Sequence, residues 1–319
     1  MLSIGVQLQG APEVQHPSLV PLAVIYFLSG GNTTCAEKIA NAKGVSTQDK
    51  ELLLASALFM RGDHKSAASL LAGINPLELS GRLTGRVALA QAFLLGDKAR
   101  QERLDVAIAS MPGTLVEESA LRRSALAYAE MRREPEFWKR LARYAHRFPN
   151  SVYAKSFWYE AMSQIVGWKE SKPDFNPEEL DIALSMLPLA MRRSIYLELT
   201  RAAASTGQSE LTGLAARRFK RLAIEGSNEE RLSRFFIAIF DIVLTNSEEA
   251  LRILQNTPRD ILNPQEQALL DAALAVGGEI ERPTSAPPYT TTDLGDKSVL
   301  ESRAHELLAK SHELIQESN

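Results

Sequence analysis

The chain has 319 residues, 45% of them hydrophobic, so it is long enough to bury a sizeable core in one large domain or two. Charge is nearly balanced, with 36 Lys and Arg against 39 Asp and Glu, which argues against the strongly basic surface of a nucleic-acid-binding protein. The single cysteine, Cys35, excludes an internal disulfide and a cysteine-based zinc cluster, but it does not decide the redox compartment.

The first strongly apolar segment is LVPLAVIYFL, at residues 19–28. It is much shorter than the roughly 20 residues that cross a bilayer, so we expect no membrane insertion. The first basic residue is Lys38, so the basic start of a secretory signal is missing. The sequence leaves two alternatives open: a cytosolic protein, or an exported one whose signal has been removed.

Helix-breaking residues recur along the chain at steps of 36, 37, 39, 38 and 32 residues; they are Pro76, Pro112, Pro149, Pro188, Gly226 and Pro258. A second set of breaks falls near the middle of most intervals, at Gly30-Gly31, Gly62-Asp63, Gly96-Asp97, Glu134-Pro135, Gly207-Gln208 and Asn246-Ser247. Each interval therefore predicts a helix, a short turn and a second helix.

Many of the expected helices begin with a capping sequence, in which a side-chain oxygen accepts a free backbone N–H and an acid three residues later reaches back. These pairs are Thr114 with Glu117, Asn176 with Glu179, Ser227 with Glu230, Asn246 with Glu249, and Asn263 with Glu266. The apolar run IAIFDIV, residues 237–243, resembles a strand in isolation. Because it lies between two capping signals, we expect a buried helix there.

Helix pairs repeating at this interval cannot bury their apolar faces singly, so they are expected to stack. We predict an all-α, tetratricopeptide-like helical-repeat solenoid of roughly seven helix pairs over residues 1–281. Residues 282–297 are rich in Pro, Thr and Ser and predict a linker. Residues 298–319 predict an amphipathic helix that either caps the solenoid or binds a partner; its apolar stripe is Leu300, Ala304, Leu307, Leu308, Ser311, Leu314 and Ile315.

No catalytic, cofactor-binding or metal site is apparent in the sequence. His305-Glu306 resembles the start of a zinc-binding helix, but the second histidine would have to stand at Ala309. Cys35 has no histidine near it in sequence, and Gly277-Gly278 lacks the pattern of a phosphate-binding loop. We therefore expect a non-enzymatic protein without cofactor, metal or small-molecule substrate.

Charge is unevenly distributed along the chain. Residues 117–147 carry a net charge of +3, residues 192–234 carry +4, and residues 246–319 carry −7. Such a distribution either steers a protein partner or belongs to solvated helix surfaces.

Aromatic residues gather in RFPNSVYAKSFWYE, residues 147–160. Tyr153 and Phe157 are four residues apart, so we expect them to share a helix face and to pack between repeat units. Trp158 or Tyr159 then lies nearer the surface, where large aromatic side chains often anchor protein interfaces.

Four phrases in this order, AVIYFLSGGN (23–32), PGTLVEESALRR (112–123), RFPNSVYAKSF (147–157) and LLDAALAVGGEI (269–280), resemble the motility protein C (MotC) family, periplasmic flagellar-motor accessory proteins of rhizobial-type bacteria. The resemblance implies a periplasmic binding protein or chaperone for the stator protein MotB, whose periplasmic domain it binds in support of flagellar rotation. Family members are expected to start with an export signal, which this chain lacks.

Within the second phrase, capping explains Thr114 and Glu117, which leaves Glu118, Arg122 and Arg123 for a partner or for salt bridges between units. Together with Trp158 and Tyr159, these three are the candidate partner-binding residues. Two alternatives stay open: a general helical-repeat adaptor in the cytosol, and the superhelical accessory region of a cell-wall enzyme.

Overall fold

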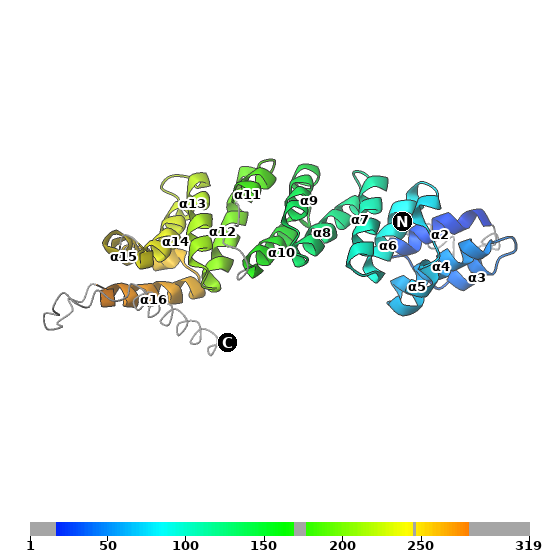
Figure 1. Ribbon diagram of the computed structural model, residues 1–319, viewed down its shortest axis with the longest axis horizontal. Helices are drawn as coiled ribbons and strands as arrows, with labels where there is room; N and C mark the ends of the chain where they lie inside the picture. Colours follow the sequence, from blue (N-terminus) through cyan, green and yellow to red (C-terminus); the bar gives the residue numbers. More distant parts are fainter. Residues whose placement is uncertain (1–16, 169–176, 245–246, 281–319) are drawn as a thin grey trace, which may run out of the picture. The chain divides into compact units, whose positions relative to one another are not determined.

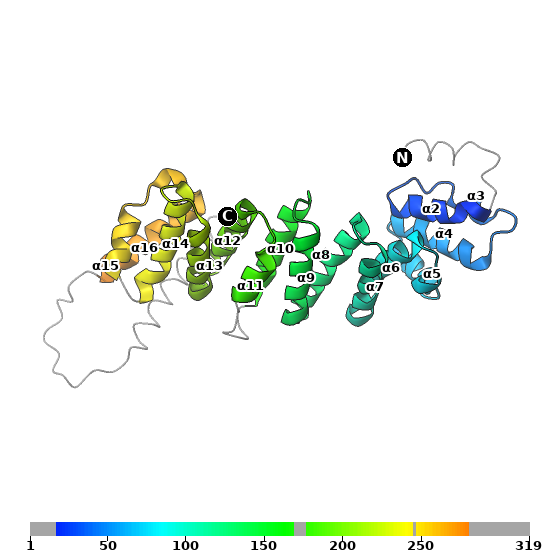
Figure 2. The same cartoon turned by 90° about the horizontal axis from the view of Figure 1, so that it is seen from above.

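The structure is a computed structural model that describes residues 17–168, 177–244 and 247–280. Over these residues it contains fifteen α-helices, short 3-10 turns and no strand, so the predicted all-α class is confirmed (Figures 1 and 2). The chain divides into two compact units, Met1–Pro149 and Asn150–Asn319. The predicted linker at 282–297 and the predicted helix at 298–319 lie outside the described residues.

Unit 1 is the blue to green part of Figure 1, and from α6 onward each of its helices packs against the next. The core around α2 includes Phe27, Leu52 and Leu53, all fully or almost fully buried. Its helices are α2 (Val20–Leu28), α3 (Ala36–Ala40), α4 (Thr47–Met60), α5 (His64–Leu71), α6 (Arg82–Leu94), α7 (Asp97–Ser110), α8 (Leu115–Glu130) and α9 (Glu134–Arg147).

Unit 2 follows the same packing rule. Here α12 to α16 pack in succession along the chain, and α10 packs against α12. Its helices are α10 (Ala154–Gly167), α11 (Pro177–Leu184), α12 (Leu189–Ser205), α13 (Ser209–Leu222), α14 (Asn228–Leu244), α15 (Ser247–Gln255) and α16 (Pro264–Ile280).

The predicted helix breaks agree with the ends of the helices in the structure. Each of the six regularly spaced marks, from Pro76 to Pro258, lies between two α-helices. Two glycines of the second set, Gly62 and Gly207, have φ values of 84° and 70°. Side chains disfavour this left-handed region, so glycine at these positions allows α4 and α12 to end in tight turns.

The capping pairs inside the described residues also form. Asn263 and Glu266 exchange both hydrogen bonds, at 2.9 and 2.8 Å, as a capping box requires. Asn176 and Asn246 lie outside the described residues. The run at 237–243 is helical and belongs to α14, where Ala238 and Ile242 are buried, so the helix prediction is confirmed.

Helices α13 and α14 approach each other closely at Gly213. A Cβ atom added to Gly213 would lie only 2.6 Å from Cγ of Phe240. The guanidinium of Arg217 covers the same ring, 4.8 Å from its centroid. Glycine is therefore required by the seam between the two helices, although it is a poor helix former.

We predict that Gly213→Ala lowers the free energy of unfolding by about 1–3 kcal/mol, because the new methyl group displaces the Phe240 ring from a packed position. The measurement is urea denaturation followed by circular dichroism. Gly278→Ala in α16 is the matched control, since its added Cβ meets no atom within 4 Å. That change should stabilise the protein by up to about 1 kcal/mol. Equal stabilisation by both variants would contradict the close approach.

Candidate protein-interaction sites

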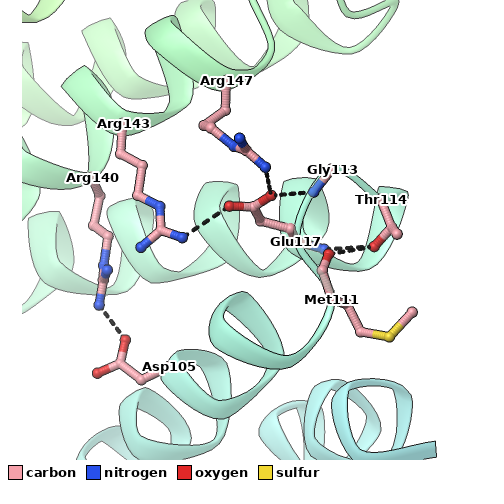
Figure 3. A network of polar contacts seen from close by, with 8 residues as sticks. All are labelled: Asp105, Met111, Gly113, Thr114, Glu117, Arg140, Arg143 and Arg147. Carbon is pink, nitrogen blue, oxygen red and sulfur yellow. Dashed lines mark hydrogen bonds and ion pairs between the residues drawn. The ribbon is translucent and has the colours of Figure 1, made fainter. Parts of the chain in front are cut away.

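The start of α8 is organised by the carboxylate of Glu117. The Thr114 hydroxyl accepts a hydrogen bond from the Glu117 backbone N–H at 3.4 Å, which is the predicted cap. The Glu117 carboxylate reaches back to the N–H of Gly113 at 2.6 Å, one residue before the position of a standard capping box (Figure 3). The N-terminal turn of α8 is thus closed by two side chains.

The same carboxylate joins α8 to α9. Arg143 and Arg147 of α9 each donate a hydrogen bond to Glu117 at 2.9 Å, and Figure 3 shows both guanidiniums pointing at it. The Glu117 side chain is fully buried, whereas the two arginine side chains are partly exposed. Burial raises the pKa of Glu117, but the Gly113 N–H, Arg147 and Arg143 together lower it more, so the pKa lies below its usual value.

A second polar network connects α7, α8 and α9. Arg140 forms an ion pair with Asp105 of α7 (Figure 3). It also donates from Nε to the buried Ser124 hydroxyl of α8 at 2.9 Å, and that hydroxyl donates to Gln101 of α7 at 2.8 Å. Three arginines of α9 therefore connect it to its neighbours: Arg140 contacts α7 and α8, and Arg143 and Arg147 contact α8.

Of the predicted partner residues on α8, Glu118 is buried and Arg122 is partly buried. Glu118 is buried and accepts a hydrogen bond from the hydroxyl of Tyr144 in α9 at 3.1 Å. Its carboxylate is also 3.9 Å from Nε of Arg122, one turn later in the same helix. Glu118 is therefore buried, and its ion pair with Arg122 joins two residues of the same helix.

Arg123, the third predicted residue on α8, is exposed. Its guanidinium lies over the ring of Phe93 in α6, 3.6 Å from the ring centroid. Phe93 is itself exposed, so this pair forms a cation–π contact at the surface of unit 1.

In unit 2 the aromatic stretch is arranged differently from the prediction. Phe157 is buried as expected, but Tyr153 is 43% exposed, because α10 begins after Tyr153, which serves as its N-cap. Trp158 is only 2% exposed, so it is not the one of the two residues that lies nearer the surface, and its part in partner binding stays a prediction. Tyr159, at 63%, is the exposed member of the pair.

Trp158 and Tyr159 both line a groove between α10 and α12, which has a volume of about 630 Å³. Most of its surface is apolar, and α10 contributes Lys155, Trp158, Tyr159 and Met162. From α12 come Met191, Ile195 and Glu198. An open, mostly apolar groove between two helices is suited to receive an apolar helix face.

The part of the chain that the structure describes contains no group of three or more His, Cys, Asp and Glu residues placed to hold a metal ion. Cys35 is buried at the start of α3, and burial raises the pKa of its thiol. None of the described helices combines the length and the apolar character needed to cross a membrane. His305 and His312 lie outside the described residues.

Over its described residues the protein is all-helical, and its candidate sites are surfaces on helices. The chain matches the family model described as "Chemotaxis protein MotC" over residues 15–317. It is 27% identical, over 301 residues, to the chemotaxis protein MotC of Rhizobium meliloti (strain 1021). The matched region covers 90% of this chain and 68% of that protein. No solved structure shows significant similarity to this chain.

The chain therefore belongs to the MotC family, and the resemblance found in its four sequence phrases is confirmed. Membership of this family supports a role in flagellar motility and chemotaxis.

We predict that Glu117→Gln lowers the free energy of unfolding at pH 7 by about 2 kcal/mol or more, because a neutral amide loses charge-assisted hydrogen bonds to Arg143 and Arg147. Urea denaturation provides the measurement. Glu130→Gln, at an exposed position of the same helix, is the matched control and should change stability by less than about 0.5 kcal/mol.

The lowered pKa of Glu117 also predicts a pH dependence. Its contribution to stability is fully present above the unfolded-state pKa, near 4.5, and is lost as pH falls through the lower pKa of the folded state. The stability difference between the native protein and Glu117→Gln should therefore shrink as pH falls below 4.5. A difference that stays constant from pH 7 to pH 3 would show that the carboxylate charge does not stabilise the fold.

Proposed function

We propose that this protein is a non-enzymatic, periplasmic binding protein and chaperone for the flagellar stator protein MotB, and that it supports rotation by binding the periplasmic domain of MotB. The observation that carries the proposal is the family match, which extends over residues 15–317 and so includes both units. The sequence phrases that resemble the family lie in both units as well.

We propose also that the helix pairs form a tetratricopeptide-like repeat solenoid of roughly seven pairs. Support comes from the packing of successive helices in each unit and from the helix breaks at regular steps along the chain. In such arrays each pair contacts mainly its neighbours, which leaves extended surfaces for a partner.

The partner surface that the geometry favours is the groove between α10 and α12. Tyr159 offers a large, exposed aromatic side chain beside an apolar floor that includes Trp158 and Met162. Aromatic anchors next to apolar pockets carry much of the free energy of protein association. The Arg123–Phe93 pair of unit 1 is a second, smaller candidate contact.

The test is calorimetric titration of the protein with the purified periplasmic domain of MotB from the same cell. We expect micromolar or tighter binding, equivalent to about −8 kcal/mol. Tyr159→Ala should weaken it at least tenfold, since the ring is lost from the groove.

Ile182→Ala is the matched control for this experiment. Ile182 is exposed to the same 63% as Tyr159 but does not line the groove, so its replacement should leave the affinity unchanged. Absence of binding by the native protein would overturn the MotB proposal. Equal weakening by both variants would overturn the assignment of the groove while leaving MotB as the partner.

A further inference from the structure

We propose that an arginine-rich surface, where α12 begins and α13 ends, binds carboxylate groups of an acidic protein segment, and that Arg192 is its central contact. The surface is formed by Arg192 and Arg193 of α12 and by Arg218 and Arg221 of α13. This inference deepens the proposed binding function, because it gives the partner a chemistry, but it does not depend on the partner being MotB.

Three of the four arginines pair with carboxylates of the same unit. Nε of Arg193 lies 2.9 Å from a carboxylate oxygen of Glu229 in α14. Arg218 donates from Nε to Asp181 of α11 at 2.9 Å, and Arg221 lies 4.0 Å from the same carboxylate. Four arginines thus share two carboxylates, and the surface keeps an excess of positive charge.

Arg192 is the member of this set without an internal partner. Its side chain forms no hydrogen bond or ion pair with any residue that the structure describes, although its Nε is inaccessible to solvent. A guanidinium nitrogen that loses water without gaining an acceptor costs free energy. A carboxylate supplied from outside recovers that cost through a charge-assisted hydrogen bond.

Arg192 lies close to the paired arginines. It precedes Tyr196 by one helical turn, and the hydroxyl of Tyr196 donates to the carboxylate of Asp181. Burial and this hydrogen bond raise the pKa of Tyr196, while the charges of Arg218 and Arg192 lower it by a smaller amount. Both guanidiniums are therefore near the Tyr196 hydroxyl, and the excess charge is concentrated beside a single carboxylate.

Helix stability does not explain the position of Arg192. It lies in the first turn of α12, which contains no acidic residue, and there the helix dipole disfavours a positive charge. Arg221 is in the last turn of α13, where the dipole favours a cation. Arg192 thus lacks both kinds of internal compensation, which suits a residue that binds an external anion.

The occupant that fits this surface is an acidic protein segment. Arg221 is 67% exposed and Arg192 is partly exposed, so an external group can approach both from solvent. Because the positive charges come from two helix ends, carboxylates spaced along a chain can reach more than one of them. A guanidinium also binds a carboxylate through two parallel hydrogen bonds, and opposite charge speeds the encounter with such a partner.

The test measures binding of a fluorescein-labelled hexaglutamate peptide to the full chain by fluorescence anisotropy, at low ionic strength, where charge pairs are least screened. We expect Arg192→Gln to weaken binding at least fivefold. Arg192→Lys should weaken it about twofold, because lysine keeps the charge but loses the planar fork. Lys65→Gln, at an exposed position of α5, removes the same charge elsewhere and should change the affinity less than twofold.

Urea denaturation separates this role from a structural one. Arg192→Gln should leave the urea midpoint unchanged or raise it, because no internal partner is lost. Arg218→Gln, which breaks the ion pair with Asp181, should lower the midpoint. A lower midpoint for Arg192→Gln would identify a structural residue and overturn the proposal.

Two binding results would also overturn it. Equal weakening by Arg192→Gln and Lys65→Gln would show an effect of net charge alone. Failure of the native chain to bind hexaglutamate would show that the surface does not take carboxylates. Because the peptide replaces MotB in this experiment, either result is distinguishable from a failure of the MotB proposal, which the titration with the MotB domain decides.

Discussion

Short turns bring consecutive helices of this protein together, so most of them, from α6 to α9 and from α12 to α16, bury an apolar face against a neighbour in the chain. Only three residues separate α8 from α9 and α12 from α13. Contacts accordingly run from α6 to α9 in one unit and from α12 to α16 in the other. The close approach at Gly213 and the buried carboxylate of Glu117 are both properties of seams between such neighbours.

Local sequence signals were sufficient to predict the helices. Proline and glycine end a helix through their own backbone geometry, so the breaks from Pro76 to Pro258 needed no tertiary information. The same holds for Asn263 with Glu266, whose hydrogen bonds join residues three apart. Residues 237–243 were assigned to a helix by their flanking caps, although their composition also suits a strand.

The candidate sites were less predictable because they depend on tertiary contacts. Capping explained Glu117 from sequence, but nothing local shows that Arg143 and Arg147 of the next helix share its carboxylate. Their spacing of four residues on one face of α9 was the available signal. The spacing of four residues between Tyr153 and Phe157 predicts a shared face only if both residues are helical, but α10 begins after Tyr153, and helix ends are uncertain by one or two residues in a sequence. Trp158 is buried because the face that α10 covers is wide enough to include both Phe157 and Trp158.

Packing between chain neighbours also affects how such a sequence can diverge. A substitution at Gly213 or Phe240 alters one seam, and a compensating change in the adjoining helix can restore it without involving distant residues. Compensating substitutions are then expected between adjoining helices, and the residues of one seam can change independently of those of another. A family built in this way can tolerate extensive change in its side chains, and this chain and its Rhizobium meliloti relative share 27% of their residues over 301 positions. For such proteins we expect the order of turns and caps along the chain to outlast the identity of the core side chains.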